Sequence, residues 1–207
     1  FMLNKKISII GNGNVGRRLR ELLEKKKYDV TIGVRNENKT KDLRVKNIED
    51  AIKESNIIIL AIPFKVVEES LKKFEKLLED KVIIDATNPL NDDWSPLELK
   101  NGISAGEYIA SLFPKSKIVK SFQMIFADIM SEDKLNYNNE KATVFISTDD
   151  IEAGNIVKEI ADSIGMSGVL TGTLKASRYT EAMAHLNIQL AVSQGKGTNS
   201  GFIYFIW

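Results

Sequence analysis

Three glycines near the start of the sequence have the spacing of a phosphate-binding turn. Gly11, Gly13 and Gly16 form a G-x-G-x-x-G pattern directly after the short apolar run 7–10. Such glycines permit a tight turn, let backbone N–H groups approach a diphosphate, and let the following helix pack closely on the strand. The diphosphate would lie at the helix N-terminus, where unpaired N–H groups and the helix dipole favour anions. The pattern therefore predicts that the chain binds a dinucleotide.

Arg35 is the residue that would distinguish between two dinucleotides. It stands at the end of a second predicted strand, within the segment GVRN. An acidic residue there usually accepts a hydrogen bond from the ribose 2′-OH of NAD, whereas an arginine accommodates the 2′-phosphate of NADP. The planar guanidinium suits bidentate binding of a phosphate. We therefore predict NADP, and we interpret the nearby Lys39 and Lys41 as solvated surface charges.

A strand, a helix and a second strand, in this order, position the glycines and the arginine. The helix is predicted after the glycines because apolar residues recur there at helical spacing, and it stops at the three lysines 25–27. The second strand is predicted over residues 29–34. This order is the structural context that the glycine pattern requires. The apolar helical positions are Val15, Leu19, Leu22 and Leu23.

The ends of further strands are expected to face the same crevice. Residues 56–62 are too uniformly apolar for a half-exposed strand and are predicted to form a central parallel strand. A helix from Pro63 to about Glu79 then leads to another strand at 81–86. Ligands of open α/β sheets bind beyond the carboxyl ends of the strands. The residues that follow these two strands should therefore lie beside the glycine turn.

The loop 91–102 is the longest irregular segment in this part of the chain, and it contains Trp94. We interpret it as a candidate substrate loop; an equally good alternative is that Trp94 only caps the core. A helix is predicted over 104–112 and a strand over 117–122. Residues 123–127 follow that strand and should face the nicotinamide region.

The pattern changes beyond about residue 130. A charged, asparagine-rich loop precedes a strand (142–147), a helix (151–164) and a short strand (167–171), which could extend the sheet. Together the patterns predict an α/β fold with a Rossmann-type, doubly wound and mostly parallel sheet. Residues 2–127 would form the dinucleotide-binding core. Residues 128–207 would form a strand and helix extension that packs on the core within the same single domain.

Two features near the C-terminus predict a subunit contact. A long helix is predicted over 174–192, and the only histidine, His185, lies on it; we interpret His185 as a surface or interface residue rather than a catalytic one. The apolar run 202–207 has strong β-propensity and should be covered, by the protein's own crevice or by a second subunit. We predict a homodimer. The predicted packing face of the helix contains Tyr179, Ala182, Met183, Leu186 and Leu190.

The composition excludes several classes of function. With 29 Lys and Arg against 28 Asp and Glu, the net charge is +1, so no global field favours nucleic acid or a membrane surface. The absence of cysteine excludes disulfides and thiolate chemistry and fits a reducing cytoplasm. No apolar run approaches the ~20 residues of a membrane span, and no signal peptide precedes the first strand. We expect a cytoplasmic protein with a small-molecule partner.

Several motifs, in order, carry a resemblance to a known family. They are GNGNVG, GVRN, LAIPF, DATNPL and SAGEYIASLFPKSKIVKSFQ. Over residues 5–127 they resemble the coenzyme F420-dependent NADP oxidoreductase family, and they are similar to the cytoplasmic reductase domain of the STEAP metalloreductases. Residues 181–204 resemble bacterial proteins known only as predicted dinucleotide-binding oxidoreductases.

The resemblance implies hydride transfer between NADPH and a flavin-like or deazaflavin (F420) partner. It also implies contacts by position: Asn12, Asn14 and Val15 at the diphosphate, Arg35 and Asn36 at the 2′-phosphate, Ala61 and Pro63 along the adenosine, Asn88, Pro89 and Leu90 beside the nicotinamide, and Phe122 further along the crevice. Two positions depart from the family. Val34 stands where a serine is common, which removes a hydroxyl donor, and Gln123 stands where the metalloreductases commonly have asparagine.

Three hypotheses of function follow. Direct hydride transfer between two planar rings needs apposition, orientation and exclusion of water, so we assign no catalytic residue and expect no metal. Reduction of a small imine or carbonyl compound is the alternative enzyme; it needs a proton donor near the nicotinamide, for which Asn88, Tyr179 and His185 are only distant candidates. A non-catalytic NADP-binding sensor is the third, and it would leave no room beside the nicotinamide.

Overall fold

The computed structural model describes residues 6–39 and 41–206. The strands within them are β1 (Lys6–Ile10), β2 (Asp29–Val34), β3 (Val45–Asn47), β4 (Ile57–Leu60), β5 (Val82–Asp85), β6 (Lys117–Lys120), β7 (Asn136–Tyr137), β8 (Glu140–Lys141), β9 (Thr143–Thr148) and β10 (Ser167–Gly172). Eight of these described strands form one sheet in the order β10-β9-β6-β5-β4-β1-β2-β3. Neighbouring strands are parallel except β6 and β9. The predicted Rossmann-type, mostly parallel sheet is confirmed.

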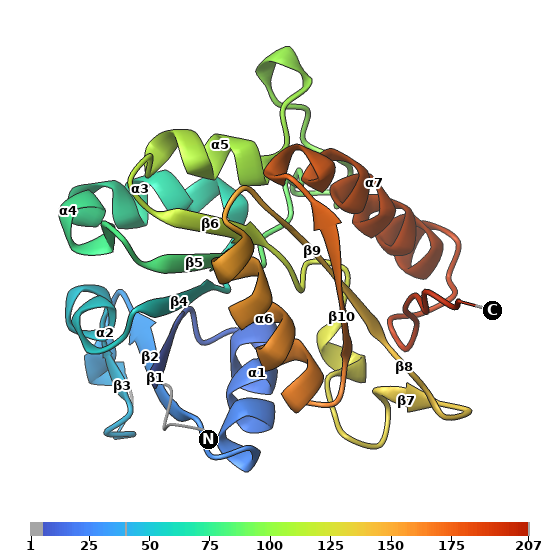
Figure 1. Cartoon of the computed structure of the whole chain (residues 1–207), viewed down its shortest axis with the longest axis horizontal. Coiled ribbons are helices and arrows are strands. Elements are labelled where there is room, and N and C mark those ends of the chain that lie inside the picture. Colours follow the sequence, from blue (N-terminus) through green and yellow to red (C-terminus); the bar gives the residue numbers. More distant parts are fainter. Residues whose placement is uncertain (1–5, 40, 207) are drawn as a thin grey trace.

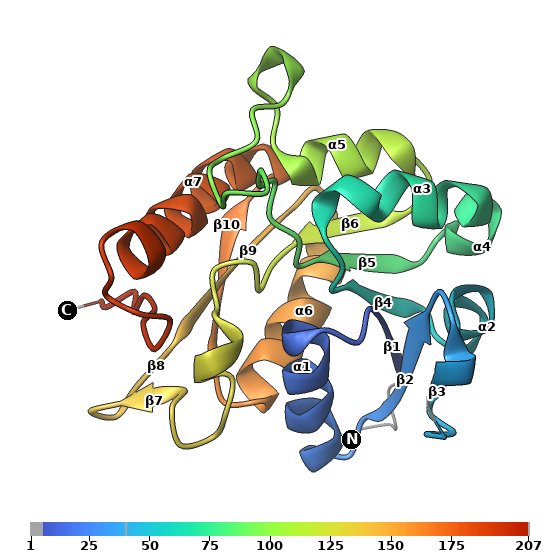
Figure 2. The same ribbon diagram turned by 180° about the vertical axis from the view of Figure 1, so that it is seen from behind.

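Helices cover both faces of this sheet (Figure 1 and Figure 2). They are α1 (Asn14–Lys25), α2 (Ile48–Glu54), α3 (Val67–Leu71), α4 (Glu75–Leu78), α5 (Ala105–Leu112), α6 (Ile151–Ser163) and α7 (Ser177–Ile188). Leu22 of α1 and Val157 of α6 belong to the apolar core on one face. Ile52 of α2 and Ile109 of α5 belong to the core on the other. The central strands are therefore buried on both sides, which explains their uniformly apolar sequences.

The prediction of a single helix from Pro63 to about Glu79 is wrong. The chain instead forms a 3₁₀-helix (Phe64–Val66), α3, a second 3₁₀-helix (Lys72–Phe74) and α4. The backbone departs from α-helical geometry at Leu71, where φ is −121°. Leu71 and Leu78 are fully buried against the sheet. Packing of these side chains, rather than helix propensity, sets the path of the segment, because tertiary contacts outweigh the small propensity differences between residues.

The strands beyond residue 130 extend the sheet as the sequence predicts. β9 pairs antiparallel with β6, so that Val119 lies opposite Thr148, and β10 pairs parallel with β9. The charged, asparagine-rich loop contains a short hairpin of β7 and β8, which the sequence did not predict. Because β9 and β10 share one sheet with β1 to β6, the C-terminal part is joined to the dinucleotide-binding part by backbone hydrogen bonds.

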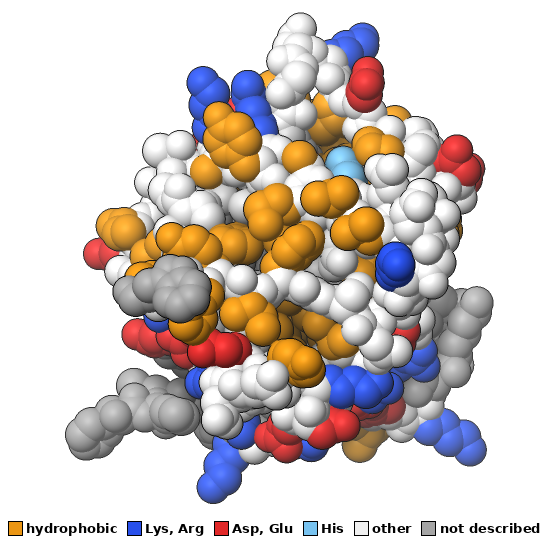
Figure 3. Space-filling view, turned by 90° about the vertical axis from the view of Figure 1, so that its right-hand side faces the viewer, with side chains coloured by type: hydrophobic (Ala, Val, Ile, Leu, Met, Phe, Trp, Pro, Cys, Tyr) orange, Lys and Arg blue, Asp and Glu red, His pale blue; other side chains and the backbone are white. Residues whose placement is uncertain are grey.

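The apolar face of α7 that we predict for a subunit contact lies on the outside of the molecule, and polar side chains take the inner face. Tyr179 is 76% exposed and Leu186 is 50% exposed, whereas Thr180, Glu181 and Asn187 are buried. Two of these buried polar side chains have hydrogen-bond partners on the inner side of the helix. Glu181 accepts hydrogen bonds from the N-terminus of α5, and Asn187 donates to the backbone after β6. The apolar side chains of α7 lie outside. Figure 3 shows apolar side chains gathered on this side of the molecule.

The C-terminal tail lies beside the start of β9 without forming a strand. The N–H of Thr143 donates to the carbonyl of Phe202 (2.9 Å), and the N–H of Tyr204 donates to Thr143 Oγ1 (2.8 Å). Tyr204 also meets the ring of Phe145 edge-on at 6.2 Å. Ile203, Tyr204, Phe205 and Ile206 nevertheless stay exposed. Phe202 is half-buried, and the prediction that the protein's own crevice covers the tail is wrong for residues 203–206. Trp207 lies outside the described residues.

The homodimer remains a prediction, and the apolar face of α7 with the tail is the surface we propose for it. Leu186→Glu is expected to weaken the dimer at least about tenfold, because burying a carboxylate in an apolar contact costs several kcal/mol. Sedimentation velocity across a concentration series measures the change. Ile151→Glu is the matched control, since Ile151 is 65% exposed on α6. A monomeric wild-type protein would contradict the prediction.

The part of the chain that the structure describes contains neither a membrane-spanning helix nor a cluster of metal-binding side chains. None of its helices combines the length and the apolar character needed to cross a membrane. Residues 6–39 and 41–206 also contain no group of three or more His, Cys, Asp or Glu side chains that could hold a metal ion.

Candidate functional site

The turn between β1 and α1 is so closely packed that only glycine fits at two positions. Gly11 has φ of +117°, and a Cβ there would lie 2.2 Å from the carbonyl oxygen of Ala61. A Cβ at Gly16 would lie 2.3 Å from the carbonyl oxygen of Gly11. At Gly13 no described atom lies within 4 Å of the Cβ position. The space beside Gly13 is therefore open to a ligand, as a diphosphate requires.

The N-terminus of α1 offers backbone N–H groups to an anion. The helix follows Gly13 without a side-chain cap and has no acidic residue in its first turn. The N–H of Arg17 donates to the carbonyl of Gly13 (3.0 Å), so the N–H groups of residues 14–16 precede the first intrahelical bond. Asn12 and Asn14 flank this end and are exposed. The helix dipole and these N–H groups fit a diphosphate.

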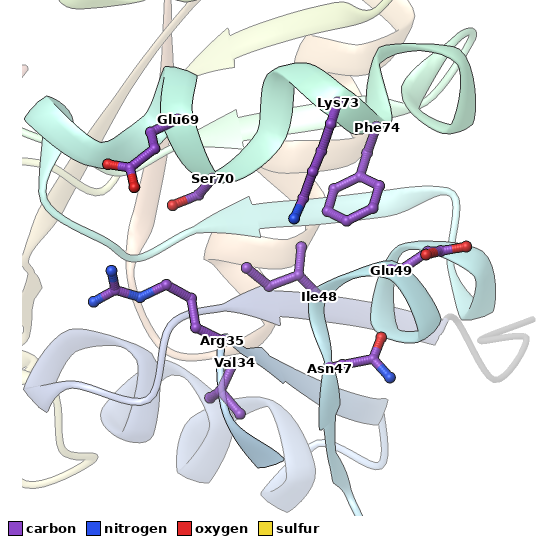
Figure 4. A pocket seen from close by; sticks show the side chains of 9 residues that line it. All are labelled: Val34, Arg35, Asn47, Ile48, Glu49, Glu69, Ser70, Lys73 and Phe74. Carbon is purple, nitrogen blue, oxygen red and sulfur yellow. The ribbon is translucent and has the colours of Figure 1, made fainter.

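A pocket of about 420 Å³ lies beyond the end of β2 (Figure 4); we call it the Arg35 pocket. Arg35 is exposed, and among the arginines of the described residues it alone has a guanidinium without a hydrogen bond or ion pair. Asn36 does not line the pocket; its Oδ1 accepts a hydrogen bond from the N–H of Asn38 (3.1 Å). The other lining residues are Val34, Asn47, Ile48, Glu49, Glu69, Ser70, Lys73 and Phe74.

Two adjoining cavities, which share six lining residues, lie along the carboxyl ends of the central strands. The turn cavity, of about 550 Å³, is lined by Gly13, Ala61 and Pro63 among others. The α7 cavity, of about 440 Å³, lies between the segment after β6 and helix α7. Their shared lining residues are Asn14, Val15, Ala86, Asn88, Leu90 and Trp94. The structure thus brings the predicted residues at the glycine turn and beyond β4 and β5 to one crevice.

The α7 cavity has a mostly apolar and aromatic lining. Phe122 is buried there with φ of +66°, a conformation that costs a bulky residue energy and is held by its surroundings. Trp94 is 57% exposed and lines both cavities. The position of Trp94 favours the substrate-loop interpretation over the core-cap interpretation. Residues 123–127 all line this cavity, as the sequence predicts.

Two side-chain amides in the lining of the α7 cavity have buried oxygen atoms without a hydrogen-bond partner in the part of the chain that the structure describes. Asn88 Nδ2 donates to the carbonyl of Gln123 (2.9 Å), and Gln123 Nε2 donates to Thr180 Oγ1 (3.0 Å). Asn88 Oδ1 and Gln123 Oε1 are buried and have no partner within the described residues. Buried acceptors without partners are rare and costly. A carboxamide, which has two N–H donors, is the kind of group that would satisfy them, and nicotinamide carries one.

A buried lysine holds the turn that carries Asn88. Lys120 Nζ donates to the carbonyl of Thr87 (2.6 Å) and to Asp85 Oδ2 (2.9 Å), and it lies 3.3 Å from Glu181 Oε1. Burial alone would lower the pKa of Lys120, but the two carboxylates outweigh burial and raise it. The sequence reasoning missed this lysine. The available signal was a lysine ending the apolar strand KIVK, parallel to a strand that ends in Asp85.

His185 and Tyr179 lie outside the α7 cavity. His185 lines a separate cavity of about 340 Å³, together with Pro89. Burial lowers the pKa of His185, opposed by the Glu181 carboxylate and the Pro89 carbonyl. His185 is half-buried rather than a surface residue. Of the three residues predicted beside the nicotinamide, Asn88 and Leu90 face the crevice, whereas Pro89 faces this other cavity.

Glu107 at the start of α5 gives a pH-dependent contribution to stability. Arg178 donates two 2.7 Å hydrogen bonds to it, Ser104 adds a capping box, and the pKa of Glu107 falls from 4.5 to about 2. The stabilisation is therefore present above pH 4.5 and lost as the pH falls toward 2. Glu107→Gln should lower the unfolding free energy by about 1–2 kcal/mol at pH 7, after solvent screening, and by less at acid pH. Urea unfolding at pH 7 and in strong acid measures this; equal losses at both would contradict it.

Helix α7 supplies part of the cavity that the sequence reasoning did not assign to it. Ala184, Asn187 and Ile188 of this helix line the α7 cavity, and Val192 of the π-helical segment that follows it (Gln189–Ser193) also lines the cavity. Asn187 donates to the carbonyl of Met124 (3.3 Å) and so fixes the segment after β6. In the sequence, the residues that face the cavity form a stripe of small and polar residues at helical spacing. From the sequence alone, we assign the packing face to the larger apolar residues on the opposite side of the helix.

Comparison with known proteins finds similarity to reductases. Residues 6–89 match the family model described as NADP oxidoreductase coenzyme F420-dependent. Metalloreductase STEAP3 of Rattus norvegicus is 30% identical over 183 residues, 86% of this chain and 36% of the relative. F420-dependent NADP reductase of Methanocaldococcus jannaschii is 26% identical over 156 residues, 72% of this chain and 69% of the relative. The chain thus spans about a third of the length of the metalloreductases that it matches.

Solved structures share the fold. A protein from Arthrobacter sp. FB24, provisionally described as an F420-dependent NADP reductase, superposes with a TM-score of 0.85 at 23% identity, over 97% of this chain and 99% of the other. The imine reductase BcSIRED from Bacillus cereus superposes with a TM-score of 0.66 at 14% identity, over 92% of this chain and 63% of the other. At these identities the likeness shows the Rossmann-type fold.

Proposed function

Because residues 6–89 match the family model described as NADP oxidoreductase coenzyme F420-dependent, we propose that the chain transfers a hydride between NADP(H) and a flavin-like or deazaflavin ring. The observation that carries the proposal is that the turn cavity adjoins the apolar α7 cavity and shares six lining residues with it. The first would hold the nicotinamide half of the cofactor, and the second would hold the acceptor ring beside it.

Bound NADPH would supply the hydride, and the protein would supply position. The N–H groups at the start of α1 would bind the diphosphate, and Arg35 the 2′-phosphate. Asn88 Oδ1 and Gln123 Oε1 would accept hydrogen bonds from the carboxamide and so fix the orientation of its ring. Trp94 and Phe122 would provide aromatic surface for a second planar ring and exclude water.

The lining of the α7 cavity favours a ring acceptor over an imine or carbonyl compound. Reduction of an imine or carbonyl needs a proton at nitrogen or oxygen as the hydride arrives. Asp128 is the one titratable side chain among the described residues that line this cavity, and it already accepts a hydrogen bond from Thr198 Oγ1. Tyr179 and His185 do not line it. The room in this cavity also argues against a non-catalytic sensor.

The test is an anaerobic assay of NADPH oxidation with F420, FMN, FAD and riboflavin as separate acceptors. A cyclic imine and a small ketone serve as the competing acceptors. We expect turnover with at least one of the ring acceptors and none with the imine or the ketone. Turnover confined to the imine or ketone would support the alternative enzyme. NADPH binding without reduction of any acceptor would contradict the proposed activity and favour a sensor.

A further inference from the structure

The Arg35 pocket contains a second cation, Lys73, which the family resemblance does not assign. In Figure 4 the Lys73 side chain extends into the pocket from the segment above it, and Arg35 extends from the end of β2 along the other side. We propose that Lys73 and Arg35 together bind the 2′-phosphate of the dinucleotide, and that the apolar residues of the pocket carry its adenine. This inference rests on the proposed binding of NADP(H).

The charge of the ligand calls for two cations. A phosphate monoester carries about −1.5 to −2 charges at pH 7, so one guanidinium leaves much of that charge uncompensated. Val34, which precedes Arg35 and lines the pocket, has no hydroxyl group to donate to a phosphate. A second cation from another element would compensate for it.

Lys73 is free to take this role. It is exposed, and its recorded contact is with the ring of Phe74, whose centroid lies 4.9 Å from the ammonium. This contact steadies the side chain without neutralising its charge. Glu69 stands four residues earlier, the spacing at which opposite charges pair on an α-helix. The helix breaks at Leu71 between them, and no ion pair joins them in the described residues.

The remaining lining of the pocket suits an adenine base. Val34, Ile48 and Phe74 provide apolar and aromatic surface for a planar ring. Of the two acids in the pocket, Glu49 is paired with Lys53 at 2.6 Å. The Glu69 carboxylate is an acceptor, and adenine has an amino group that donates. The pocket therefore combines two cations, an apolar floor and an acceptor, which together match adenosine 2′-phosphate.

The test is calorimetric titration of Lys73→Ala with NADPH, NADH and 2′,5′-ADP. We expect about tenfold weaker binding of NADPH and 2′,5′-ADP and less than a twofold change for NADH, the loss expected for one charged contact. Lys73→Arg should retain most of the affinity. Lys76→Ala is the matched control, because Lys76 is an exposed lysine of the following helix α4 and does not line the pocket. Arg35→Ala/Lys73→Ala should bind NADPH no better than NADH.

The outcomes separate this inference from the proposed function. If Lys73→Ala behaves like Lys76→Ala while Arg35→Ala loses NADPH selectively, Lys73 is not a phosphate ligand and the proposed function stands. If Lys73→Ala weakens NADPH and NADH equally, Lys73 supports the pocket in general, and the inference is overturned. If the wild-type protein binds neither NADPH nor 2′,5′-ADP, the proposed function itself fails.

Discussion

Replacement of Arg35 by alanine is expected to weaken NADPH binding about ten- to hundredfold and to leave NADH binding nearly unchanged. A hydrogen bond to a charged group contributes about 1.5–3 kcal/mol, which corresponds to that range. Because the Arg35 guanidinium has no partner among the described residues, its removal should break no internal contact. The loss would therefore report on the ligand rather than on the fold.

Parallel titrations of NADPH and NADH, by calorimetry or by tryptophan fluorescence, measure this selectivity. Arg18→Ala is the matched control, since Arg18 is an exposed arginine of α1 whose ion pair with Glu21 lies on the surface. Arg18→Ala should alter neither affinity. Equal losses for NADPH and NADH in Arg35→Ala would show that Arg35 does not contact the 2′-phosphate. Failure of the wild-type protein to bind either nucleotide would contradict the reading of residues 11–16 as a cofactor site.

Replacement of Lys120 by methionine is expected to lower the unfolding free energy by about 3–5 kcal/mol. Removal of one partner from a buried ion network leaves the others charged without compensation. Asp85 is fully buried and Glu181 nearly so, and the Thr87 carbonyl would also lose its donor. For a chain of this size the melting temperature should fall by roughly 10 °C. NADPH binding should weaken as well, since the turn that carries Asn88 loses its support.

Thermal and urea unfolding measure this loss, with Lys117→Met as the control. Lys117 lies on the same strand, is partly exposed, and pairs with Asp150 at 3.2 Å. Its replacement should cost less than about 1 kcal/mol. Adding Asp85→Asn and Glu181→Gln to Lys120→Met removes the uncompensated charges and should recover part of the stability. Equal effects of Lys120→Met and Lys117→Met would contradict the proposed role of the network.

These two predictions concern opposite kinds of residue. Arg35 is exposed and unpaired within the described residues, so we expect it to contribute to ligand binding and not to folding. Lys120 is buried and fully partnered, so we expect it to stabilise the backbone at Thr87 that it contacts. The two effects should therefore separate in experiment: Arg35→Ala changes nucleotide selectivity at constant stability, and Lys120→Met changes stability first.

The sequence alone was enough to predict the dinucleotide-binding turn. Gly11 and Gly16 are required because a Cβ would collide with carbonyl oxygens of the adjoining backbone. Such constraints act over short stretches of chain, so they appear as a fixed spacing of residues. The mostly apolar strands were also predictable, since a strand covered by helices on both faces favours apolar side chains at nearly every position. The position of Arg35 directly after β2 follows from the same local order.

Only the tertiary structure decided which face of α7 is buried. Leu186 and Tyr179 lie on the outer face, whereas Glu181 and Asn187 take the inner face because their side chains hydrogen-bond to backbone groups that are distant in the sequence. The ion network of Lys120 is likewise a set of contacts between elements far apart in sequence, and the fold alone places Lys73 and Arg35 in the lining of one pocket. The spacing of residues within a short stretch of sequence does not reveal such distant partners. A polar residue reveals whether it is solvated, structural or part of a binding site only when the fold brings its partners together.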